Sequence, residues 1–164
     1  LARSNTSDVD VAVPYESVHR GYYLKQARIL GTAEDGSMLY EIEAEHAEQT
    51  EERRIDFSDV RIRYSPDSDV PWIVNADQAT LMEGSPQITL RGHVVALNRG
   101  DSDSQETEIR TEYLELDPER YVAETDHRVQ VRIGARSLTA TGMLASLNDN
   151  HFELKANVRG KIAP

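Results

Sequence analysis

The residues of this chain that could do chemistry are its histidines and carboxylates. The 164 residues include 29 Asp and Glu, five His and no Cys, which excludes thiol nucleophiles, thiolate metal sites and disulfides. None of the histidines stands at the short spacing typical of zinc ligands; they are His19, His46, His93, His127 and His151. We therefore predict no metal site and no cofactor.

Paired carboxylates are the other chemical possibility, because two acidic groups can hydrolyse a glycosidic bond. Glu41, Glu43 and Glu45 alternate with apolar neighbours, which is typical of the solvated face of a strand. The sequence contains neither a G-x-S-x-G nucleophile elbow nor a Walker phosphate loop. We predict that the protein is not an enzyme.

Composition further limits the classes of protein to which this chain can belong. The length suits one domain, and 38% of the residues are apolar, which is enough for a core. No stretch is long and apolar enough to be a transmembrane helix. The formal net charge of −11 repels nucleic acid, whose binding proteins carry basic faces. We expect no nucleic-acid partner.

The elements that must position any site are almost all strands. Apolar and polar residues alternate in short runs that are separated by turn sequences such as Asp35-Gly36 and Asn148-Asp149-Asn150. The expected strands cover residues 22–30, 38–47, 54–63, 71–81, 87–97, 106–116, 121–124, 128–133, 136–141, 144–147 and 152–162. We predict an all-β fold of antiparallel strands.

A degenerate repeat links these strands. Its four copies begin at Ile42-x-Ala44-x-x-Ala47, Val74-x-Ala76-x-x-Ala79, Ile109-x-Thr111-x-x-Leu114 and Leu138-x-Ala140-x-x-Met143. Each copy continues through a turn into a second apolar strand and is read as one hairpin. Because a single hairpin cannot bury its own apolar face, the copies are expected to stack.

One expected strand contains two apolar sets of opposite parity. Ile55 and Phe57 are odd, whereas Val60, Ile62 and Tyr64 are even, so a regular strand would turn one set toward solvent. A β-bulge near Ser58-Asp59 would place both sets inside. We predict such a bulge.

At these residues the sequence resembles the LptC family of lipopolysaccharide export proteins, which belongs with LptA and the LptD N-terminal domain. The resemblance covers roughly residues 22–162. Its clearest pieces are Gly36-x-x-x-Tyr40-x-Ile42-x-Ala44-x-His46, Pro71-Trp72-x-Val74-x-Ala76-x-x-Ala79-x-Leu81, Ile88-x-Leu90-x-Gly92-x-Val94, Leu138-x-Ala140-x-Gly142-Met143 and Phe152-x-Leu154-x-x-x-Val158. The resemblance implies an open, twisted β-jelly-roll over residues 21–164, after a flexible N-terminal stalk over residues 1–20.

The resemblance also implies a function. Such a domain lies in the periplasm, shields lipopolysaccharide acyl chains in an apolar groove and passes them from an inner-membrane ABC transporter of the LptBFG type to an LptA-type protein. The family's anchoring helix would precede Leu1. Two alternatives stay open, an LptA-like soluble bridge and a β-domain that binds only protein partners.

Two kinds of functional site are predicted, a groove that binds the lipid and edges that bind partner proteins. The groove lining is expected to be Ala27, Ile42, Ile55, Phe57, Val60, Trp72, Val74, Ile88, Leu90, Val94, Leu138, Phe152, Leu154, Val158 and Ile162. The partner-docking edges are expected at the two ends of the roll, with Tyr22, Tyr23 and Leu24 at one end and Leu154, Ala156, Val158 and Gly160 at the other. An ordinary structural core is the alternative for every residue of the lining.

Overall fold

Ten strands form the fold in the computed structural model, which describes residues 9–11, 23–51, 53–65, 71–100 and 106–162. The strands are β1 (Val9–Val11), β2 (Tyr23–Thr32), β3 (Met38–Glu51), β4 (Arg54–Tyr64), β5 (Trp72–Met82), β6 (Ile88–Asn98), β7 (Thr107–Asp117), β8 (Val122–Ile133), β9 (Arg136–Ser146) and β10 (His151–Ile162). They lie in one sheet in the order of the sequence, and every neighbouring pair is antiparallel. The predicted open all-β roll is confirmed.

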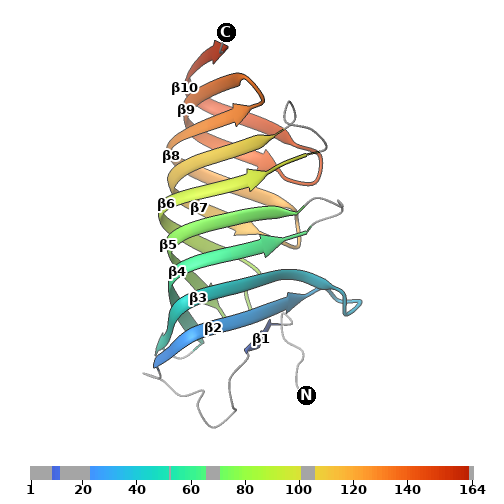
Figure 1. The fold of residues 1–164 in the computed structure, drawn as a ribbon, viewed down its shortest axis with the longest axis vertical. Helices are drawn as coiled ribbons and strands as arrows, with labels where there is room; N and C mark the ends of the chain where they lie inside the picture. The colour runs from blue at the N-terminus through green and yellow to red at the C-terminus, as the bar shows by residue number, and fades with distance from the viewer. Residues whose placement is uncertain (1–8, 12–22, 52, 66–70, 101–105, 163–164) are drawn as a thin grey trace.

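The sheet is bent so that each long strand runs through two layers. In Figure 1 the strands cross the front of the molecule, turn along one edge and continue behind. The layer that contains Ile42, Ile62 and Val74 is called layer A, and the layer that contains Phe57 and Leu90 is called layer B. Apolar side chains from both layers fill the space between them and form the core.

The bend has a signature in the burial pattern. In β3, Ala44 and Ala47 are both buried, while Glu45 and His46 between them are not; β5 repeats this with Ala76 and Ala79. Two successive outward residues therefore change the side of the strand that faces the core. Several residues at the bend have left-handed backbone conformations, namely Gln26, Asp59, Gly92, His93, Gly142 and Asn157. The buried residues on either side of the bend, Ile42, Ala44 and Ala47 in β3, have the i, i+2, i+5 spacing of the sequence repeat.

The predicted bulge in β4 is wrong. Ser58 pairs with His46 and Gln78, and Val60 pairs with Ala44 and Ala76, so the register is continuous through Asp59. The left-handed conformation of Asp59, with φ of 57°, changes the side of the strand without an extra residue. Both apolar sets nevertheless have buried members, since Phe57, Val60, Ile62 and Tyr64 all lie in the core.

Extra residues occur instead in the bends of three other strands. The ladders shift register between Arg91 and Val94 in β6, between Thr125 and Arg128 in β8, and between Ala156 and Arg159 in β10. The sequence prediction divided β8 and β9 at their bends, at residues 125–127 and 142–143, because the apolar alternation breaks there. Each of these pairs of predicted strands is one continuous strand.

The glycine at the bend of β6, Gly92, is expected to tolerate a side chain poorly. Gly92 has φ of 83°, and a Cβ atom there would lie 2.7 Å from Asp77 Oδ2. Gly92→Ala should lower the free energy of unfolding by roughly 2–4 kcal/mol, from left-handed strain and overpacking together. Gly84 has φ of 89° but nothing within 4 Å of its added Cβ, so Gly84→Ala carries only the strain, roughly 1–2 kcal/mol. Equal losses in urea unfolding would contradict a close approach at the bend.

Candidate functional site

Most of the predicted lining lies deep between the two layers. Ala27, Ile42, Phe57, Val60, Trp72, Val74, Ile88, Leu90 and Val94 are all at most 7% exposed. Ile55, Phe152 and Leu154 are partly buried and pack against this core. The structure thus places one continuous apolar interior along the roll, and these residues are also its structural core.

The side of the roll opposite the bend is called the open side, because the two layers end there and the sheet does not connect them. The Tyr64 hydroxyl, at the end of β4 in layer A, donates a hydrogen bond of 2.6 Å to the Pro118 carbonyl in the turn after β7. Trp72 Nε1, at the start of β5, donates one of 3.1 Å to the Leu147 carbonyl in the turn after β9. These contacts join residues 54 and 75 positions apart and close the side of the roll that has no bend.

The C-terminal end of the roll is less covered than its middle. Leu138 is partly buried, and Val158 in β10 is 51% exposed. β10 is the last strand in the sheet order, so one of its edges has no neighbour among the described strands. Ile162 ends β10, and its side chain lies outside the described residues.

The comparisons with known proteins agree with this architecture. Residues 8–163 match the family described as "Lipopolysaccharide-assembly, LptC-related". The chain belongs to this family. A crystal structure of LptH from Pseudomonas aeruginosa, described as the LptA homologous periplasmic component of a lipopolysaccharide transport device, has the same fold, with a TM-score of 0.62. It is 10% identical to this chain, and the alignment covers 76% of this chain and 95% of LptH. No curated protein matched.

The N-terminal end of this LptC-related chain differs from the sequence prediction in one respect. Val9–Val11 form β1, which pairs with Ile29, Leu30 and Gly31 of β2, so β2 is not the outermost strand along those residues. Tyr23 and Leu24 pair with Glu48 and Ala47 of β3, and β1 does not reach them. Tyr22, and residues 1–8 and 12–20 of the predicted stalk, lie outside the described residues. In the part of the chain that the structure describes, no helix is long and apolar enough to cross a membrane.

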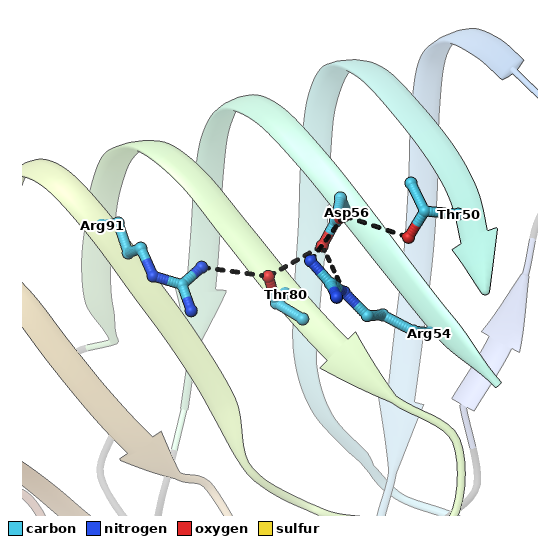
Figure 2. Close-up of polar contacts among 5 residues, drawn as sticks. All are labelled: Thr50, Arg54, Asp56, Thr80 and Arg91. Carbon is cyan, nitrogen blue, oxygen red and sulfur yellow. Dashed lines mark hydrogen bonds and ion pairs between the residues drawn. The ribbon is translucent and has the colours of Figure 1, made fainter. Parts of the chain in front are cut away.

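The outer face of layer B in this LptC-related chain carries a polar network instead of a groove. Figure 2 shows Asp56 of β4 at its centre. Its carboxylate accepts hydrogen bonds from Thr80 Oγ1 at 2.8 Å and from Arg54 Nη2 at 3.1 Å. Thr50 and Arg91 extend the network to β3 and β6. It links four strands on the outside and leaves the inside apolar.

Histidines and carboxylates meet at the bend, which the sequence spacing did not predict. Ligand atoms of Glu45, His46 and Asp59 lie within 4.8 Å of one another, because the bend turns two successive residues of β3 outward beside Asp59. Farther along, His93 Nδ1 lies 2.7 Å from Asp77 Oδ2, and this hydrogen bond raises the pKa of His93. Two hollows of about 430 and 400 Å³ lie at the bend. The first is lined by Arg110 and by the buried Val94, and the second by Arg61 and by the buried Ala27.

Proposed function

We propose that this chain holds the acyl chains of lipopolysaccharide between layers A and B and passes the lipid along the cell envelope. The observation that carries the proposal is the continuous apolar interior in an LptC-related roll. Exposing acyl chains to water costs roughly 0.8 kcal/mol per methylene, so one twelve-carbon chain costs on the order of 10 kcal/mol. A roll that separates along its open side can replace its own core contacts with acyl chains while the sugar head stays in water.

The partners and the location follow from the same proposal. The domain would lie in the periplasm, held at the inner membrane by a helix preceding Leu1, and would receive lipid from an LptBFG-type transporter. The sheet edge at Tyr22, Tyr23 and Leu24 would face that transporter. The edge at Leu154, Ala156, Val158 and Gly160 would face an LptA-type protein, and pairing the two sheets would join their interiors. No catalytic group is needed for this role.

Photo-crosslinking tests the location of the lipid. Groups placed at Phe57, which is 1% exposed, and at Phe152 should capture lipopolysaccharide. Groups at Glu43 and Lys155, which are exposed on the outer surface, are matched controls and should not. Equal capture at all four positions, measured by gel shift of the crosslinked chain, would defeat the proposal.

The two alternative functions predict different results, one in the crosslinking experiment and the other in cell fractionation. A β-domain that binds only protein partners would show no capture at Phe57 or Phe152. An LptA-like soluble bridge would show the same capture, but the full-length protein would partition into the soluble periplasmic fraction. The expected result is capture at the interior positions together with recovery of the full-length protein in the inner-membrane fraction.

A further inference from the structure

Two aromatic side chains hold the open side of the roll shut. Tyr64 and Trp72 are 0% and 1% exposed, yet each donates its one hydrogen to a main-chain carbonyl of the opposite layer, that of Pro118 or Leu147. Both acceptors lie in turns, outside the ladder hydrogen bonds of the sheet. The two contacts therefore join layers A and B at points where the sheet itself does not.

The two turns are linked to each other. The Leu147 amide donates a hydrogen bond of 2.8 Å to the Tyr121 carbonyl, which connects the turn after β9 to the turn after β7. Because of this link, the acceptors of Tyr64 and Trp72 belong to one connected margin of layer B. If that margin moves away from layer A, both contacts break together.

A third aromatic residue lies beside this margin. Tyr40 in β3 is 5% exposed, and its pKa is raised by burial and by the negative charge of Glu119 in the turn after β7. Its ring fills the space next to Gly31, where an added Cβ would collide with the ring. Three large aromatic residues from successive strands thus line the same closed margin.

We propose that Tyr64 and Trp72, flanked by Tyr40, form a latch, and that acyl chains enter the roll sideways when this latch opens. The inference rests on the proposed function and adds the route of entry and the residues that control it. Sideways entry suits an amphiphile, because the acyl chains can pass between the layers while the bulky head remains in solvent. Opening also frees the Tyr64 O–H and the Trp72 N–H, which can donate to ester or phosphate oxygens at the junction of head and chains.

The first test removes one latch hydrogen bond. Tyr64→Phe keeps the buried ring but leaves the Pro118 carbonyl without its hydroxyl donor, which favours the open form. The rate at which the purified chain takes up a fluorescent lipid A probe should rise about fivefold, the effect of one buried hydrogen bond. Tyr113→Phe is the control, since the Tyr113 hydroxyl bonds Glu115 on the outer face and its loss should leave the rate unchanged.

The second test locks the latch. It compares the bridged and unbridged forms of one variant, so any weakening of the core is the same in both. The chain has no cysteine, so Tyr64→Cys with Pro118→Cys can be bridged by a short bismaleimide after folding. Bridging should slow uptake at least about tenfold relative to the same variant without the bridge, because the lost hydrogen bond and ring are common to both. Unchanged uptake after bridging would mean that lipid enters from an end of the roll and would overturn the latch.

The outcomes separate this inference from the function on which it rests. A wild-type chain that does not bind the probe, and is not captured at Phe57, defeats the proposed function. A wild-type chain that binds the probe, with equal rates in Tyr64→Phe, Tyr113→Phe and the bridged variant, defeats the latch alone. Trp72→Phe supplies an independent arm, and its uptake should also be faster than that of the wild type.

Discussion

Replacing Trp72 with alanine is expected to lower the free energy of unfolding by about 3–5 kcal/mol, the usual cost of truncating a large buried aromatic residue. Trp72 is 1% exposed, so the variant leaves a cavity between the layers. It also removes the donor to the Leu147 carbonyl, which links β5 to the turn after β9. Urea unfolding followed by circular dichroism measures this loss.

The neighbouring position provides the control for Trp72. Ile73 follows it in β5 but points to the outer face and is only partly buried. Ile73→Ala should cost roughly 1 kcal/mol or less, because the truncated side chain leaves no enclosed cavity. If both variants lost the same stability, the assignment of inner and outer faces in β5 would be wrong.

Replacing Val158 with aspartate is expected to weaken binding of an LptA-type partner at least about tenfold. Val158 is 51% exposed, and the proposed docking would bury it, so the introduced carboxylate would have to be desolvated at the interface. The free chain should keep its stability, because an exposed position accepts a charge at little cost. Titration calorimetry with the purified partner, alongside thermal unfolding, measures both quantities.

Met38 offers a matched control for this docking prediction. It is 53% exposed and lies in β3, far from β10 in the sheet order. Met38→Asp should leave partner affinity unchanged. Full-strength binding by the Val158 variant would exclude β10 as the docking edge, whereas equal weakening in both variants would indicate a general charge effect.

The strands could be predicted from the sequence because apolar alternation is a local property. The bend could have been read from the same residues, since each repeat places its third apolar residue at i+5. That spacing was interpreted as part of a hairpin, and the bends of β8 and β9 were interpreted as gaps between strands. The bulge was placed in β4, where the left-handed conformation of Asp59 serves the same purpose. Backbone conformation of this kind leaves no fixed residue signature, because Asp, Gln, His and Asn all adopt it here.

The candidate site was less predictable than the strands. The apolar interior followed from the repeat, but the latch depends on which turn of layer B meets which strand of layer A. That pairing is set by the twist of the sheet and joins Trp72 to Leu147, 75 residues away. The cluster of Glu45, His46 and Asp59 was missed for a related reason, since its members come from two strands and no linear spacing describes them. β1 was missed because three residues are too few to show alternation.

The order of the strands in the sheet has a consequence for how the chain acquires its structure. Every ladder joins strands that are consecutive in the sequence, so each step of assembly closes only a short loop, unlike the long-range pairings that slow most all-β proteins. The roll should therefore grow strand by strand from whichever hairpin forms first, as repeat proteins do. A hairpin inserted or removed would change the length of the roll without rearranging any other pairing, so the reach of such a protein can evolve in steps of two strands.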